Sequence, residues 1–202
     1  MAKRLTLVRH GETVGQSSIR YYGATDVALS ELGIRQIQCV RDALAREAFD
    51  AVYSSELQRT TLAARIIAPQ LPLLPMAEFN EINFGDWEGL TREEIAERDP
   101  QTYARWRERP HDFTYPSGDT LALFRARVAN AFRNLLPSLP ERTLMVVHRG
   151  IISTIVAALL DLSASERAEY PIDLASIHVL SLHDGKWRTE LVNGVDHLGE
   201  AA

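Results

Sequence analysis

The sequence predicts an α/β fold whose central sheet is built largely from buried parallel strands. Short apolar runs alternate along the chain with longer segments in which apolar residues recur at helical spacing. The apolar runs are continuous, as in strands that are covered on both faces. Two of them end abruptly in histidine, arginine and glycine. In open α/β sheets ligands bind at the carboxyl ends of the strands, so these residues mark a candidate site.

The composition indicates a single globular domain. The chain has 202 residues, of which 46% are hydrophobic and 24% are charged, so one sizeable core can form. A net charge of −5 and an isoelectric point near 5.7 argue against a nucleic-acid or membrane partner. The longest apolar run, Ile151 to Leu160, is too short to span a bilayer, and the N-terminus lacks a signal-peptide core. The single cysteine, Cys39, excludes an internal disulfide, so we expect a cytoplasmic monomer or homodimer.

The first predicted strand covers Leu5 to Val8 and runs directly into Arg9, His10 and Gly11. Such a strand would present a cation, an imidazole and a flexible turn at the carboxyl end of the sheet. The chemical interpretation is that His10 is a nucleophile or ligand, Arg9 binds an anion, and Gly11 permits close approach of the backbone. The alternative is a strand that ends in solvated charges, and this short motif alone leaves both open.

The next segments alternate between helical and extended patterns. Ser30 is a good helix N-cap, and the apolar residues after it recur at helical spacing. Arg59 falls in the first turn of the second helix, where a cation opposes the helix dipole and a bound anion would compensate. The alternative for Arg59 is a solvated surface charge. In order, the predicted elements are a loop over 14–29, a helix over 31–46, a strand over 51–54, and a helix over 57–67.

An acidic and aromatic segment, Glu78 to Gly89, follows an extended edge segment over 71–76. It contains too many turn residues for a regular element, and its carboxyl groups stand among aromatic and apolar side chains. At least one carboxyl is therefore expected to be partly desolvated, with the raised pKa that a general acid needs. The candidates are Glu78, Glu81, Asp86 and Glu88.

Residues 89–118 are predicted to form an inserted cap over the strand ends of a single domain that spans 1–202. Thr91 and Glu94 match a capping box at a helix start. The arginines of this region alternate with acidic residues, so solvated helix faces explain them better than a polyanion site. The predicted cap consists of a helix over 91–99, a helix over 101–108 and a loop over 110–118.

The second half of the chain repeats the opening arrangement. A buried strand over 143–147 runs into His148, Arg149 and Gly150. If the two strands lie side by side, His10 and His148 meet at one edge of the sheet. A lone histidine is more often structural, but that explanation is harder to hold for two histidines that each end a buried strand. The other elements predicted here are helices over 120–136 and 151–160 and a hairpin of strands over 177–182 and 187–192.

Four separated segments together carry a resemblance to a known family. They are LVRHGET at the start, SSELQRT at 54–60, NEINFGDWEG at 80–89, and VVHRG at 146–150. They resemble the histidine phosphatase superfamily, in the branch that includes cofactor-dependent phosphoglycerate mutases and α-ribazole phosphatases, and the resemblance covers nearly the whole chain. The family implies a three-layer α/β/α sandwich with a mostly parallel sheet and one antiparallel strand, which agrees with the alternation described above. It implies no metal and no cofactor.

The resemblance also assigns roles to individual residues. It implies that His10 attacks the phosphorus of a phosphomonoester as a neutral imidazole and forms a phosphohistidine. Arg9, Arg59 and His148 would surround the phosphoryl oxygens. Glu81 would protonate the leaving alkoxide and then take a proton from the attacking water. The expected substrate-binding residues are Tyr22, Gly23, Arg149 and Gln16, which stands where the family usually has asparagine.

The resemblance specifies the reaction more closely than the substrate. The segment between Gly89 and Pro116 is shorter than the insertion of the phosphoglycerate mutases, and Tyr22 replaces the small hydroxyl residue expected before Gly23. Both features favour metal-independent hydrolysis over mutase transfer. Candidate substrates are α-ribazole 5′-phosphate, phosphoserine, sugar phosphates and phosphoglycerates. The alternatives are a phosphoglycerate mutase and a catalytically weak signalling module that binds a phospholigand.

Overall fold

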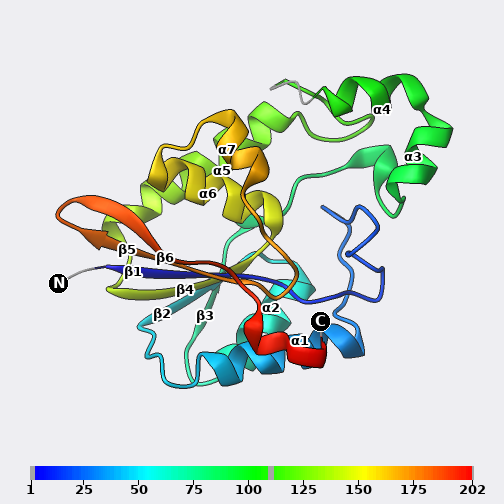
Figure 1. The fold of residues 1–202 in the computed structure, drawn as a ribbon. Helices are drawn as coiled ribbons and strands as arrows, with labels where there is room; N and C mark the ends of the chain where they lie inside the picture. The colour runs from blue at the N-terminus through cyan, green and yellow to red at the C-terminus, as the bar shows by residue number, and fades with distance from the viewer. Residues whose placement is uncertain (1–2, 109–111, 202) are drawn as a thin grey trace.

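Six strands form one sheet, in the order β3-β2-β4-β1-β5-β6, in the computed structural model, which describes residues 3–108 and 112–201 (Figure 1). Strands β1 to β4 pair in parallel, and β5 runs antiparallel to both of its neighbours. The prediction of a mostly parallel sheet with one antiparallel strand is confirmed. The strands are β1 (Arg4–Arg9), β2 (Ala51–Ser54), β3 (Leu73–Pro75), β4 (Arg142–Val147), β5 (Ile177–His183) and β6 (Lys186–Gly194).

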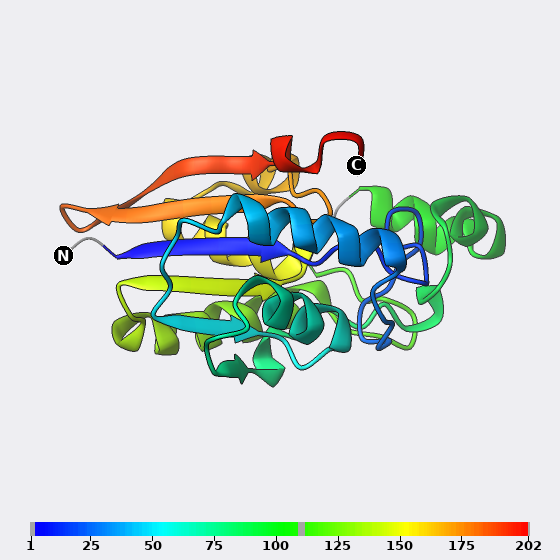
Figure 2. The same cartoon turned by 90° about the horizontal axis from the view of Figure 1, so that it is seen from below.

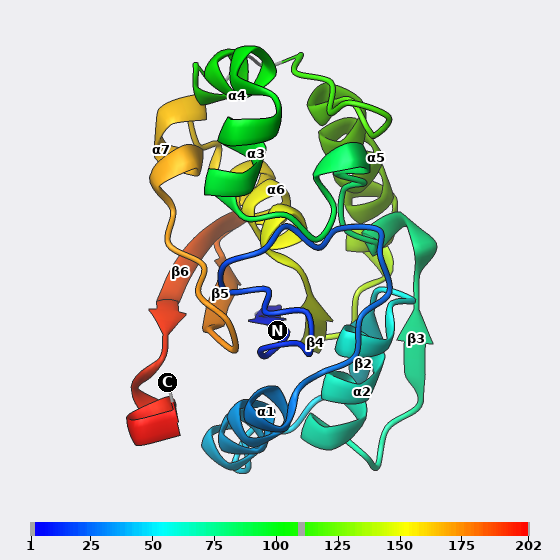
Figure 3. The ribbon, with the colours of Figure 1, turned by 90° about the vertical axis from the view of Figure 1, so that its right-hand side faces the viewer.

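The two strands that end in histidine lie side by side at the centre of the sheet. The register of β1 and β4 pairs Arg9 with Val147. The backbone N–H of His10 then donates to the Val147 carbonyl at 3.1 Å. Because both strands run in the same direction, His10 and His148 emerge at the same edge of the sheet, and Figure 3 faces this edge.

Helices cover both faces of the sheet and complete the three-layer sandwich, with α1 and α2 on one face and α5, α6 and α7 on the other (Figure 1). Neighbouring residues of a strand point to opposite faces, so Leu7 packs in the core with α5 and α6, while Val8 packs with α1 and α2. No helix in the described residues has the length and apolar character needed to cross a membrane. The helices are α1 (Glu31–Ala43), α2 (Gln58–Ile67), α3 (Arg92–Arg98), α4 (Pro100–Arg107), α5 (Leu121–Leu135), α6 (Arg149–Leu160) and α7 (Ala164–Glu169).

Helices α3 and α4 lie beyond the carboxyl ends of the parallel strands, in the segment predicted as a cap (Figure 2). The predicted capping box is present, because the Thr91 side chain accepts from the Glu94 N–H and the Glu94 side chain accepts from the Thr91 N–H. Aromatic rings join the cap to the site region, with Trp87 and Trp106 5.7 Å apart between centroids. Residues 109–111, where the predicted loop over 110–118 begins, lie outside the described residues.

Two helices differ from the prediction. Helix α6 begins at Arg149 with His148 as its N-cap, two residues before the predicted start, so Arg149 belongs to the first turn. Helix α7 was not predicted, although Ser163 and Glu166 form a capping box at its start. This helix has six residues and none is buried, so its sequence carries no apolar periodicity.

Candidate active site

His10 is held as a neutral imidazole with one ring nitrogen free to react. Its side chain is 4% exposed, and its Nδ1 lies 2.8 Å from the carbonyl oxygen of Gly11. A carbonyl only accepts hydrogen bonds, so the proton resides on Nδ1 and the lone pair on Nε2. Burial, together with the charges of Arg59 and Arg9, lowers the pKa of His10 well below its ordinary value. At neutral pH His10 therefore presents an unprotonated nitrogen.

Arg59 lies in the first turn of α2, and its side chain is completely buried. Its Nη1 donates to the Thr25 carbonyl at 2.9 Å, and its Nη2 donates to the Gly23 carbonyl at 2.6 Å. These two bonds fix the plane of the guanidinium group. Burial lowers the pKa of Arg59, and nearby carboxylates, Glu81 first among them, oppose this shift. The alternative that Arg59 is a solvated surface charge is therefore wrong.

Three buried nitrogen atoms at this end of the sheet have no hydrogen-bond partner among the described residues: Arg9 Nε, Arg59 Nε and His148 Nδ1. Other atoms of these side chains are tied to the protein. Arg9 Nη1 donates to the Ile172 carbonyl at 3.0 Å, and His148 Nε2 lies 2.8 Å from Ser55 Oγ. Buried polar groups without a partner are costly and rare. A phosphoryl group has three oxygen acceptors that suit the two guanidinium donors, and His148 Nδ1 adds a third donor in the tautomer whose Nε2 accepts from Ser55 Oγ.

The two histidine rings meet at an angle, with centroids 5.2 Å apart and planes inclined by 64°. Burial and the charges of Arg59, His10 and Arg9 lower the pKa of His148 well below its ordinary value. Both imidazoles are therefore neutral at pH 7. In the part of the chain that the structure describes, no three His, Cys, Asp or Glu side chains gather in an arrangement that would hold a metal ion.

Glu81 is a buried carboxyl with a raised pKa, as the sequence predicts for its segment. Its side chain accepts hydrogen bonds from the Gly150 N–H at 2.9 Å and from the Ile82 N–H at 3.1 Å. Burial raises the pKa of Glu81, and the two N–H groups and the charges of Arg59 and Arg9 offset part of this effect. Such a carboxyl keeps its proton to a higher pH than an exposed glutamate, so it can act as a general acid.

Gly150 allows Glu81 to lie where it does. A Cβ atom at position 150 would lie 2.4 Å from Glu81 Oε1 and 3.0 Å from the ring of Phe124. We therefore expect Gly150→Ala to displace the carboxyl and to lower kcat on alkyl phosphates by about 10²-fold, the lower end of the effect of a general acid. Competitive inhibition by vanadate should change little, because Arg9 and Arg59, the residues expected to bind the oxyanion, are unchanged. Unchanged kcat would contradict this account.

The Glu88 carboxylate organises the loop that holds Arg59. It accepts hydrogen bonds from the N–H groups of Gly23 at 3.0 Å, Ala24 at 3.0 Å and Thr25 at 3.3 Å. Gly23 and Thr25 are also the residues whose carbonyls bind Arg59. Glu88, one of the four carboxyl candidates of the acidic segment, therefore helps to position Arg59 through this loop.

The predicted substrate-binding residues do not lie together. Arg149 lines the cavity described below. Gly23 is buried, and a Cβ atom there would lie 1.7 Å from the Ile82 carbonyl oxygen, so packing alone requires glycine. Gln16 is exposed with a left-handed φ of 62°, Tyr22 is half-buried, and neither lines the cavity. Direct contact of Gln16, Tyr22 and Gly23 with substrate stays a prediction.

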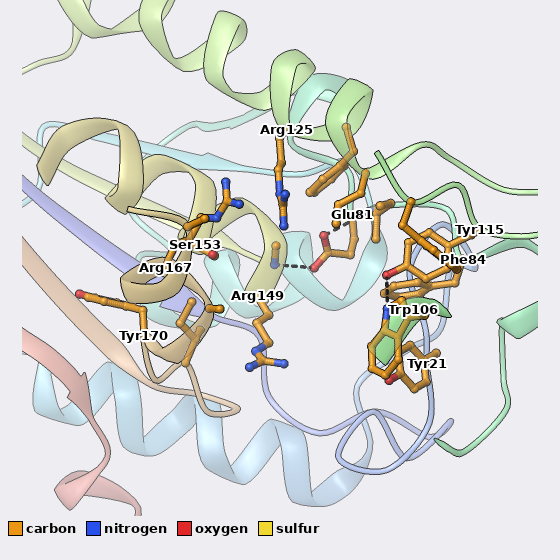
Figure 4. Close-up of a pocket in the computed structure, with 18 of the residues that line it drawn as sticks. Tyr21, Glu81, Phe84, Trp106, Tyr115, Arg125, Arg149, Ser153, Arg167 and Tyr170 are labelled. Atoms are coloured by element: carbon orange, nitrogen blue, oxygen red, sulfur yellow. Dashed lines mark hydrogen bonds between the residues drawn. The ribbon is translucent and has the colours of Figure 1, made fainter. Parts of the chain in front are cut away.

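A cavity of about 620 Å³ opens beside Glu81 and Gly150 (Figure 4). One side is aromatic, and the other carries arginines. Because Glu81 lies at its border, the cavity offers room for a small organic group next to this carboxyl. The aromatic side comprises Tyr21, Phe84, Trp106 and Tyr115, and the arginine side comprises Arg125 and Arg167 with Ser153.

Several site residues were not singled out from the sequence. Ser55 stands inside the SSELQRT segment but was given no role, and Tyr21 lines the cavity where its neighbour Tyr22 was expected to contribute. Arg125 and Arg167 carry no motif. Arg92 is exposed, as the interpretation of the cap arginines as solvated expects, but it also lines the cavity next to Tyr21.

Comparison with known proteins gives matches over nearly the whole chain. The histidine phosphatase superfamily (branch 1) matches residues 5–194. Phosphoserine phosphatase 1 of Hydrogenobacter thermophilus is 33% identical over 200 residues, which cover 98% of this chain and 95% of the relative. The crystal structure of the α-ribazole phosphatase from Shigella flexneri has a TM-score of 0.85 at 28% identity and covers 95% of this chain and 96% of that one. The structure of a mycobacterial glucosyl-3-phosphoglycerate phosphatase has a TM-score of 0.84 at 28% identity. The match covers 96% of this chain and 100% of that one.

Proposed function

The chain belongs to branch 1 of the histidine phosphatase superfamily and is a phosphatase, and we propose that it hydrolyses a small phosphomonoester through a phosphohistidine on His10, without a metal ion. One observation carries this proposal. The neutral His10 keeps its Nε2 lone pair beside buried donors of Arg9, Arg59 and His148 that have no partner among the described residues. A nucleophile and a set of oxyanion donors in one place suit phosphoryl transfer.

In the first step, His10 Nε2 attacks phosphorus in line with the leaving oxygen. The P–N bond forms as the P–O bond to the leaving group breaks, and the leaving oxygen takes the proton from the Glu81 carboxyl. Arg9 and Arg59 bind the phosphoryl oxygens and stabilise the charge that spreads over them in the transition state. The raised pKa of Glu81 supports its role as the acid of this step.

In the second step, the Glu81 carboxylate takes a proton from a water molecule, whose oxygen attacks phosphorus. The P–N bond breaks, and its electron pair returns to His10 Nε2. Inorganic phosphate leaves, with His10 neutral and Glu81 protonated again. Because the same carboxyl gives a proton in one step and takes one in the other, a single buried glutamate serves both steps.

The pH dependence of kcat/KM follows from the directions of the two pKa shifts. His10 must be neutral, and its lowered pKa places the acidic limb of the profile below the ordinary histidine value of 6.5. Glu81 must be protonated, and its raised pKa places the alkaline limb above the ordinary glutamate value of 4.5. We therefore expect a bell-shaped profile whose alkaline limb disappears in Glu81→Gln. A profile that is flat in the wild type, or unchanged in the variant, would contradict the requirement for a neutral His10 together with a protonated Glu81.

A screen of phosphomonoesters in the presence of a chelator tests the proposed function. We expect p-nitrophenyl phosphate and at least one of phosphoserine, α-ribazole 5′-phosphate, sugar phosphates and phosphoglycerates to be hydrolysed at a rate that EDTA does not change. Loss of activity with EDTA that Mg²⁺ restores would contradict the metal-independent mechanism. Interconversion of phosphoglycerates without release of phosphate would indicate a mutase instead.

A further inference from the structure

Two arginines face the cavity without an acidic partner. Arg125 comes from α5 and Arg167 from α7, and both side chains are half-buried. Among the residues that the structure describes, neither guanidinium group makes a hydrogen bond or an ion pair. Their charges interact unfavourably, since burial and the charge of Arg167 lower the pKa of Arg125 to about 10. Two like charges held together in a partly desolvated place are costly unless an anion compensates them.

Apart from Glu81, the carboxyl group on the wall of the cavity among the described residues is that of Glu169, and it does not supply this compensation. Glu169 is exposed and makes no ion pair with either arginine. Burial alone accounts for the lowered pKa of Arg167, with no carboxylate opposing it. The pair therefore remains uncompensated by the described residues of this chain.

The position of the pair relates it to the leaving group. Figure 4 shows Arg125 and Arg167 on one side of Glu81. The aromatic side chains of Tyr21, Phe84, Trp106 and Tyr115 lie on the other side. Arg125 follows Phe124, whose ring lies against the backbone of Gly150, the residue that donates to Glu81. In the proposed mechanism Glu81 protonates the leaving oxygen. A leaving oxygen placed at Glu81 would therefore have the arginine pair on the side away from Tyr21, Phe84, Trp106 and Tyr115.

We propose that the leaving group carries a second anionic group, a carboxylate or a phosphate, that Arg125 and Arg167 bind. This inference rests on the proposed function, because it concerns the alcohol that is released. Guanidinium groups bind planar carboxylates and phosphates through paired hydrogen bonds. The volume of about 620 Å³ is in the range of sites for small organic ligands, and the aromatic side gives the body of the leaving group an apolar surface.

Matched esters test the second anion without a change in the reacting bond. One substrate is para-carboxymethylphenyl phosphate, and its neutral partner is the corresponding carboxamide, whose methylene group keeps the two phenols similarly acidic. Phosphoglycerate and glycerol phosphate form a second, shorter pair. We expect the wild type to prefer the anionic member of at least one pair by about 10- to 100-fold in kcat/KM, the effect of one or two charge-assisted hydrogen bonds.

The variants assign this preference to the arginine pair. In the double variant Arg125→Gln/Arg167→Gln the preference should fall to about one, with kcat/KM for the neutral ester little changed. Arg133→Gln is the matched control, because Arg133 is an exposed arginine of the same helix that bonds to Asn130 outside the cavity. If the double variant also loses activity on the neutral ester, the single variants test the assignment instead. Each of them should then reduce the preference for the anionic ester in part.

The outcomes separate this inference from the proposed function. Hydrolysis of both members of every pair without preference, or a preference that survives in the variants, would overturn the second anion site and leave the phosphatase mechanism standing. Failure to hydrolyse any of the esters would contradict the proposed function and the inference that rests on it.

Discussion

Replacing His10 by alanine is expected to lower kcat by at least about 10⁴-fold, because no other group can form the covalent intermediate, and loss of a nucleophile has effects of this size or larger. Arg9, Arg59 and His148 stay in place in this variant. It should therefore still bind unreacted substrate, within about tenfold of the wild type.

Steady-state rates and a binding titration of the same preparation test this prediction. The matched control is His183→Ala, because His183 is exposed at the end of β5 that lies beside the start of β1, away from the site. A His10→Ala protein that keeps substantial activity would contradict the proposed nucleophile. Loss of both activity and substrate binding would point to a disturbed fold, which a melting curve would reveal.

Replacing Glu81 by glutamine is expected to slow the hydrolysis of alkyl phosphates by about 10²- to 10⁴-fold, the usual contribution of general acid catalysis. Glutamine has nearly the same shape, but it has no acidic proton to give. Its one side-chain oxygen can accept from either the Gly150 or the Ile82 N–H, which donate to separate oxygens of Glu81. An alkoxide is a poor leaving group and needs that proton, whereas p-nitrophenolate leaves readily without it. Phosphorylation of His10 by p-nitrophenyl phosphate should therefore be much less affected.

The useful measurement for Glu81 is the ratio of the rate loss on alkyl esters to the rate loss on aryl esters. Both losses are taken from single-turnover rates, so that hydrolysis of the intermediate does not mask the first step. Glu78→Gln provides the control, since Glu78 belongs to the same acidic segment but is exposed. Equal losses on alkyl and aryl esters would argue against an acid that protonates the leaving group. They would favour a role for Glu81 in holding the structure of the site.

The two histidines at the ends of neighbouring strands could be predicted, because buried strands and the residues that follow them can be recognised from local sequence. Continuous apolar residues before His10 and His148 indicate buried strands, and parallel strands end at one edge of a sheet. The apolar neighbours in the acidic segment likewise predicted a raised pKa for at least one of its four carboxyl groups, and in the structure burial raises the pKa of Glu81. These features need only the strand pattern and the composition of one segment.

The arginine side of the cavity could not be predicted in this way. Arg125 is on an amphipathic helix where arginines commonly face solvent, and Arg167 is on a helix too short to carry a periodic pattern. Only the packing of α7 beside α5 and α6 brings the two into one cavity. The Glu88 contacts with the loop that holds Arg59 are likewise long-range, joining positions more than 60 residues apart in sequence.

The central claim, a covalent phosphohistidine on His10, is tested most directly by the stereochemistry at phosphorus. A phosphorothioate monoester made chiral with two oxygen isotopes is hydrolysed in water of a third isotope, and the configuration of the released thiophosphate is determined. Each in-line displacement inverts phosphorus, so attack by His10 followed by attack by water predicts overall retention. Inversion would mean that water displaces the leaving group directly, and it would contradict the phosphohistidine mechanism.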